Sequence, residues 1–172
     1  FKNNEFFNQL FTKGITKPLE NIFKNNMVKV PANIFLSCFY ICLRVTKNSL
    51  DLMKVLVDYD RRNDNCIDFE HRDFLSEVIS YESNKKMSFD EDKTVEDMVN
   101  YIVENGGNVN FQSGKYYATP LENAITMEYH PLVLALIKTK KVDYNHMIRY
   151  DTLRERTNPY YRTRLPIMVS SS

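Results

Sequence analysis

Few residues of the types that carry chemistry lie close together in this sequence. Cys38 and Cys42 are four positions apart, a spacing that places two side chains on one face of a helix and can hold a metal ion. No histidine or carboxylate follows at a ligand-like distance, and the residues around the two cysteines are apolar. We therefore interpret both as buried free thiols, and we expect no metal and no cofactor.

The histidines offer a second kind of chemistry, because a histidine beside a cysteine can activate the thiol as a nucleophile. His71, His130 and His146 are scattered, however, and neither they nor Cys66 lie in a local catalytic motif. We expect that the chain is not an enzyme. An enzyme on an unrelated helical fold that uses a Cys/His pair remains an alternative, which labelling of a single reactive thiol would favour.

A short acidic run, Asp90-Glu91-Asp92, could in principle bind a cation or supply an acid and a base. It lacks the spacing of a calcium loop, and lysines flank it within segment 82–93. We interpret 82–93 as a solvated polar insertion between two helices.

Composition limits the remaining function classes. The chain has 172 residues, 43% of them hydrophobic and 26% charged, with a net charge of +1, which is typical of a folded domain and not of a polyelectrolyte. Its four glycines cannot build a nucleotide-binding loop, and a β-sandwich or barrel would need more. Three cysteines favour a reducing compartment, the cytoplasm or the nucleus. The longest apolar stretch, 34–45, is too short to span a membrane, so no membrane contact is expected.

The apolar residues recur at helical spacing in paired short segments. We predict three helix pairs, at 31–59, 71–104 and 120–139, whose first members are the apolar segments Ile34–Val45, Phe74–Tyr81 and Leu121–Met127. An irregular pair at 4–13 and 18–25 is expected to cap the N-terminal end. Residues 146–172 are expected to form a degenerate cap or tail. The prediction is one all-α domain over 1–172, in which 1–30 is the N-terminal cap and 31–145 hold about three repeats.

The segment 98–145 carries the most specific pattern. Gly106-Gly107-Asn108-Val109-Asn110 is followed by Thr119-Pro120-Leu121 and by a small residue, Ala124. Asp143-Tyr144-Asn145 then repeats Asn108-Val109-Asn110 after 35 residues. This segment resembles the ankyrin repeat. The pattern predicts that Gly106 ends one helix with a positive φ and that Thr119 caps the next. Glu122 departs from the family, which has a histidine there.

The resemblance implies an ankyrin-like solenoid of stacked helix-turn-helix pairs that binds another protein through its hairpin tips and its concave helix surface. Because the chain is rich in asparagine and lysine and its repeats are degenerate, it resembles ankyrin proteins that viruses and intracellular bacteria direct at host factors. The hairpin 111–117 gathers aromatic residues, which are frequent at interfaces. The expected partner-binding residues are Phe111, Gln112, Lys115, Tyr116 and Tyr117, extended by Tyr59, Arg61 and Arg62 at the end of the earlier pair.

The C-terminal tail, 149–164, mixes arginines with tyrosines, a combination that can follow a phosphate backbone and stack on bases. No nucleic-acid motif accompanies it, so a capping segment is the preferred interpretation and nucleic acid is not the expected partner. A nucleic-acid binder that uses this tail is the second alternative. A steep dependence of binding on salt would support it.

Overall fold

The computed structural model divides the chain into two compact units, Phe1–Val142 and Asp143–Ser172. It describes residues 17, 21, 23–25, 30–46, 48–63, 67–79, 90–113 and 118–144. Of the second unit only Asp143 and Tyr144 are described, so the predicted tail at 146–172 lies outside the described residues. In the first unit, the predicted cap segment at 4–13 and Cys66 also lie outside them.

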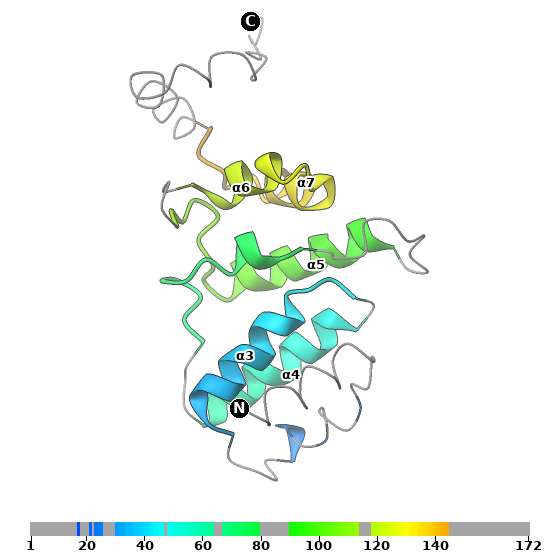
Figure 1. Ribbon diagram of the computed structural model, residues 1–172, viewed down its shortest axis with the longest axis vertical. Coiled ribbons are helices and arrows are strands. Elements are labelled where there is room, and N and C mark those ends of the chain that lie inside the picture. Colours follow the sequence, from blue (N-terminus) through cyan, green and yellow to red (C-terminus); the bar gives the residue numbers. More distant parts are fainter. Residues whose placement is uncertain are drawn as a thin grey trace, which may run out of the picture. The chain divides into compact units, whose positions relative to one another are not determined.

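The described part of the chain is helical (Figure 1). Its elements are α3 (Ala32–Cys42), α4 (Ser49–Arg62), the single 3-10 turn η1 (Leu75–Glu77), α5 (Glu91–Glu104), α6 (Pro120–Thr126) and α7 (His130–Lys138). No strand occurs among these residues, only two isolated bridges, so the all-α prediction is confirmed. Helices α3 with α4 and α6 with α7 contact each other as pairs, and α5 packs against both α4 and α7.

The first pair folds around an aromatic cluster. The ring of Tyr59 from α4 lies 5.5 Å from that of Phe35 in α3 and 5.1 Å from that of Phe23. All three side chains are buried. Helix α4 carries Asp51 in its first turn and Arg61 in its last, which is the charge distribution that a helix dipole favours.

The second pair differs from the prediction, because the described part of its first member, residues 74–79, does not form a full helix. Asp73 accepts a hydrogen bond from the Ser76 amide, 3.0 Å, and starts only one turn, η1. The backbone is extended at Val78, and Ile79 forms a parallel bridge with Arg44. In that bridge the Val45 amide donates to the Ile79 carbonyl at 2.9 Å. Two consecutive β-branched residues favour this extended conformation over a helix.

The acidic run is also placed differently from the prediction. Asp90 is the N-cap of α5, where its side chain accepts from the Lys93 amide at 3.0 Å. Glu91 and Asp92 occupy the first turn of α5, where carboxylates are favoured by the helix dipole. The run therefore starts a helix and is not part of a loop, while residues 82–89 lie outside the described residues.

The third pair begins as predicted. Thr119 caps α6 through a capping box: its hydroxyl accepts from the Glu122 amide, and the Glu122 carboxylate accepts from the Thr119 amide at 2.7 Å. Glu122 thus binds back to the start of its own helix. Leu121 and Ala124 are buried.

Three helices end with a residue in the left-handed conformation. Gly106 follows α5 with φ 101°, as predicted, and the Gly107 amide donates to the Ile102 carbonyl at 2.9 Å to complete a Schellman motif. A Cβ on Gly107 would lie 2.5 Å from the Ile102 side chain, so this position has no room for one. Glu128 after α6 and Lys140 after α7 have φ 56° and 57°. Gly106 and Lys140 are 34 residues apart, so these two helix ends repeat in sequence as well as in geometry.

Candidate functional site

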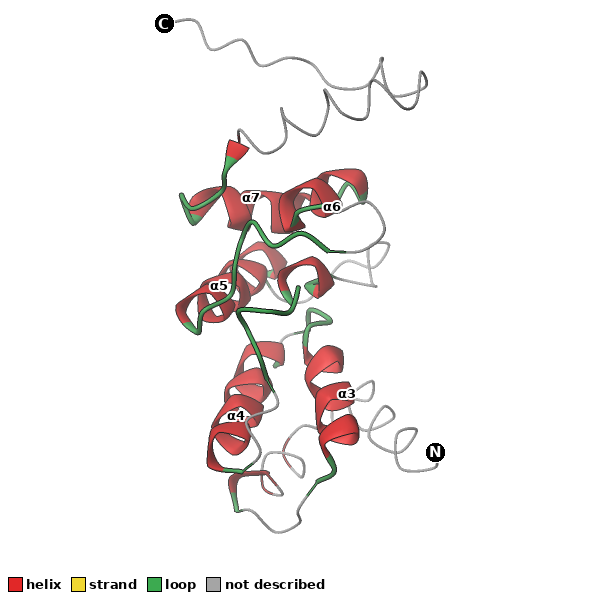
Figure 2. Ribbon diagram, turned by 90° about the vertical axis from the view of Figure 1, so that its left-hand side faces the viewer, coloured by secondary structure: helices red, strands yellow, loops and turns green. Residues whose placement is uncertain are grey.

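A groove of about 540 Å³ crosses the first member of each helix pair. Helices α3 and α6, which contribute to it, lie together on one side of the first unit, whereas α4 and α5 lie on the other (Figure 2). It is lined by Tyr40 of α3, His71, Arg72 and Asp73 before η1, Ser76 and Glu77 of η1, Phe111 and Ser113 of the hairpin, Asn123 of α6, and Met127 at its end.

A chain of hydrogen bonds forms the polar part of this groove. The Ser113 hydroxyl donates to the Asp73 carboxylate, whose other oxygen accepts from the Ser76 amide. The Asn123 amide group donates to the Ser76 hydroxyl at 3.0 Å. These contacts tie the hairpin and α6 to η1, so the groove has a fixed shape. They also occupy Asp73 with bonds inside the chain.

Three apolar side chains surround these polar groups. Tyr40 is 38% exposed, and its ring lies 5.5 Å from that of the buried Phe74. Met127, at the C-cap of α6, is 52% exposed, and Phe111 is half-buried. Tyrosine and methionine are enriched at protein interfaces because they offer a large apolar contact area. The groove can therefore accept an apolar side chain.

The groove has charged side chains at both ends of η1. Arg72 precedes the turn and Glu77 ends it, and both are exposed. Within the described ranges neither side chain forms a salt bridge. His71, by contrast, contacts the Asp68 carboxylate at 3.1 Å. Hydrogen bonds from the His71 amide lower the pKa of Asp68, so that carboxylate is charged near neutral pH.

The predicted contact residues fall into three groups. Phe111 and Gln112 are described, the first half-buried and the second exposed, at the base of a hairpin that is closed by mutual hydrogen bonds between Ser113 and Ala118. Lys115, Tyr116 and Tyr117 lie outside the described residues.

The third group of predicted contact residues lies at the end of α4 and comprises Tyr59, Arg61 and Arg62. These side chains make contacts within the chain. Tyr59 is only 1% exposed, and its hydroxyl accepts from the Val30 amide at 3.0 Å, so it does not belong to a contact surface. Arg62 is exposed, but its guanidinium donates to the carbonyls of Phe23 and Lys24, each at 3.1 Å. It thereby anchors the segment before α3.

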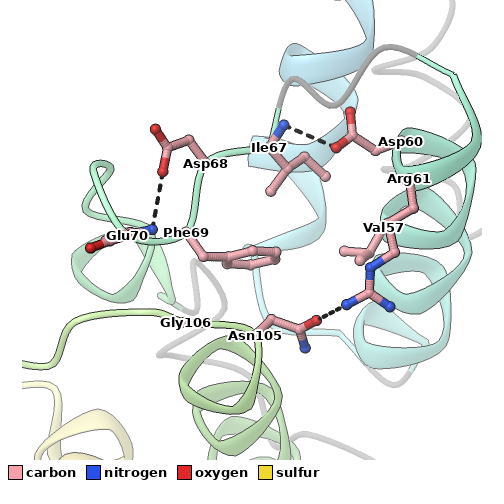
Figure 3. A pocket seen from close by; sticks show the side chains of 9 residues that line it. All are labelled: Val57, Asp60, Arg61, Ile67, Asp68, Phe69, Glu70, Asn105 and Gly106. Atoms are coloured by element: carbon pink, nitrogen blue, oxygen red, sulfur yellow. Dashed lines mark hydrogen bonds between the residues drawn. The ribbon is translucent and has the colours of Figure 1, made fainter.

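Arg61 borders a second concavity of about 380 Å³ (Figure 3). Its guanidinium donates to the Asn105 side chain across the space between α4 and the end of α5. Asp60, which is buried, accepts from the Ile67 amide at 3.1 Å. These hydrogen bonds join α4, the loop that follows it and the end of α5, so the polar side chains of this concavity have a structural role within the chain.

The cysteines and metal-binding groups give no reactive centre in the described part of the chain. Burial raises the pKa of the Cys38 thiol to about 12. The pKa of the Cys42 thiol is also raised, mainly by burial and to a smaller extent by the neighbouring Cys38. Both are free thiols, as expected. No cluster of three metal-ligating side chains occurs among the described residues, and none of the described helices is long and apolar enough to cross a membrane.

Of the ten residues that line the groove, sequence reasoning named only Phe111 as a contact residue, and the residues that it missed include Tyr40, His71, Arg72 and Met127. Ile67 and Val109 are both buried and both lie five positions after the last residue of a helix, α4 and α5. Asp73 then accepts from the Ser76 amide of η1, and Thr119 caps α6. Residues 67–71 thus hold the same position in sequence after α4 as residues 109–113 hold after α5. Aligning Ile67-Asp68-Phe69 with Val109-Asn110-Phe111 would have pointed to this loop instead of the end of α4.

No family model, no curated protein and no solved structure matches this chain. The resemblance to the ankyrin repeat therefore remains a prediction from the residues of the sequence.

Proposed function

We propose that this chain is an ankyrin-like repeat module that binds a partner protein through the groove between its first helices and its hairpins. The observation that carries the proposal is the groove itself, because it joins residues of α3, η1 and α6 into one surface with exposed Tyr40 and Met127. Residues from three successive pairs can meet in this way when the pairs are stacked in register.

The repeated local geometry supports the solenoid. The ends of α5 and α7 share a left-handed residue 34 positions apart, and the loops 67–73 and 109–119 both connect a helix end to a capped turn. A period of about 33 residues is that of the ankyrin repeat. The proposed stack comprises α3–α4, η1–α5 and α6–α7.

The chemistry of the groove supports binding over catalysis. Asp73, Ser76 and Ser113 hydrogen-bond to one another, and His71 contacts Asp68. A nucleophile would instead require a base within hydrogen-bond distance and a reacting position beside it. We propose that the module acts by holding side chains rigidly, in the cytoplasm or nucleus, with no covalent step.

Affinity capture with a matched pair of variants tests this function. Tyr40→Ala/Met127→Ala removes two exposed apolar side chains of the groove, whereas Lys54→Ala changes an exposed residue of α4 outside it. We expect wild type and Lys54→Ala to retain the same partner protein and the groove variant to lose it, with unchanged circular dichroism. A captured set that is identical for all three proteins contradicts the proposal.

A further inference from the structure

We propose that the groove recognises a linear segment of the partner that places a carboxylate on Arg72 and an apolar side chain beside Tyr40 and Met127. This inference rests on the proposed function and specifies the chemistry of the partner. Its basis is the charge of the groove at the loop that precedes η1.

Arg72 is the cation of the groove that is available to a partner. It is exposed and, among the described residues, has no acidic neighbour within ion-pair distance. Two aspartates of the same loop are engaged within the chain: Asp68 binds His71, and Asp73 accepts from Ser76 and Ser113. A guanidinium presents a planar pair of donors that matches a carboxylate, which makes Asp or Glu the complementary residue.

The fixed backbone around Arg72 favours recognition. The Phe74 amide donates to the Arg72 carbonyl at 3.0 Å, and the Asp73 side chain accepts from the Ser76 amide of η1 at 3.0 Å. Arg72 therefore stands on a constrained loop, and only its side chain must be ordered on binding, which lowers the entropic cost.

The size and composition of the groove set the rest of the segment. A volume of about 540 Å³ holds a few side chains and not a folded domain. Tyr40 and Met127 provide the exposed apolar contacts. Glu77, at the other end of η1, would repel a uniformly acidic peptide. The expected ligand thus carries an apolar residue with an acidic residue on one side only.

Selection from a phage-displayed library of random linear peptides tests this inference on the full chain. We expect the peptides enriched on wild type to combine an aliphatic or aromatic residue with Asp or Glu. Arg72→Glu should weaken their binding about fivefold or more, and added salt should reduce the difference. The matched control Lys54→Glu makes the same charge change on α4, outside the groove, and should leave binding unchanged.

The outcomes separate this inference from the proposed function. In one outcome, the peptides bind equally to wild type and Arg72→Glu but do not bind Tyr40→Ala/Met127→Ala. That result overturns the assignment of Arg72 and leaves the groove as the binding site. Peptides that bind Tyr40→Ala/Met127→Ala as well as wild type, or no enrichment at all, remove the support for the groove and for the proposed function with it. Arg72, Tyr40 and Met127 are all exposed, so neither variant is expected to unfold the chain.

Discussion

At the scale of single residues, the left-handed position after α6 is an unfavourable backbone conformation for the residue that occupies it. Glu128 has φ 56°, a conformation that costs a residue with a Cβ about 1 kcal/mol. It is held there because the Tyr129 amide donates to the Ala124 carbonyl at 2.9 Å and closes the Schellman motif. Gly106 meets the same demand after α5 without this cost.

We therefore expect Glu128→Gly to raise the free energy of unfolding by about 0.5–1 kcal/mol. The control Thr126→Gly places a glycine two residues earlier, at the last residue of α6, where it should lower that free energy by roughly 0.3–0.5 kcal/mol. Urea denaturation measures both. Equal effects of the two glycines would show that the turn does not hold Glu128 in the left-handed conformation.

At the scale of elements, the start of α6 depends on its cap because the helix has only seven residues. The Thr119 hydroxyl accepts from the Glu122 amide, which would otherwise have no partner inside the helix. We expect Thr119→Ala to be less stable than Thr119→Ser by about 1 kcal/mol, since these two variants differ only in the hydroxyl. Thermal unfolding measures the difference, and equal melting temperatures would rule out a role for this hydroxyl.

The elements also show how far the sequence could predict the structure. Helices α4, α5 and α7 follow from their apolar spacing, and the caps at Gly106 and Thr119 follow from residue type. Ile79 could not be placed, because its extended conformation depends on a bridge to Arg44, which is distant in sequence. Tyr59 was assigned to the surface for a similar reason: its burial depends on Phe23, which lies in a segment with no clear repeat pattern.

The candidate site was predicted only in part, for the same physical reason. Phe111 borders the groove as expected, since it follows the recognisable turn Gly106-Gly107. Arg72 and Met127 line the same groove because α6 contacts η1, which is distant from it in sequence. Apolar periodicity describes which face of a helix is buried, but it does not state which exposed residues of different repeats meet.

At the scale of the whole molecule, the proposed solenoid makes a claim about cooperativity. In a stack of repeats each pair contacts only its neighbours, so stability is approximately a sum of local terms. In the first unit α5 packs against both α4 and α7 and thus lies between the other two pairs. Loosening one end pair should leave the other largely unaffected.

Hydrogen exchange of two core variants distinguishes this arrangement from a single cooperative core. Leu136 in α7 and Leu56 in α4 are both fully buried, so each change to Ala should cost about 2–5 kcal/mol. For Leu136→Ala we expect faster amide exchange in α6 and α7 than in α3 and α4, and for Leu56→Ala the reverse, because local opening follows local stability. Amide exchange that is accelerated uniformly from α3 to α7 in both variants would mean that the pairs unfold as one unit. The proposal that each repeat contributes independently to stability would then be wrong.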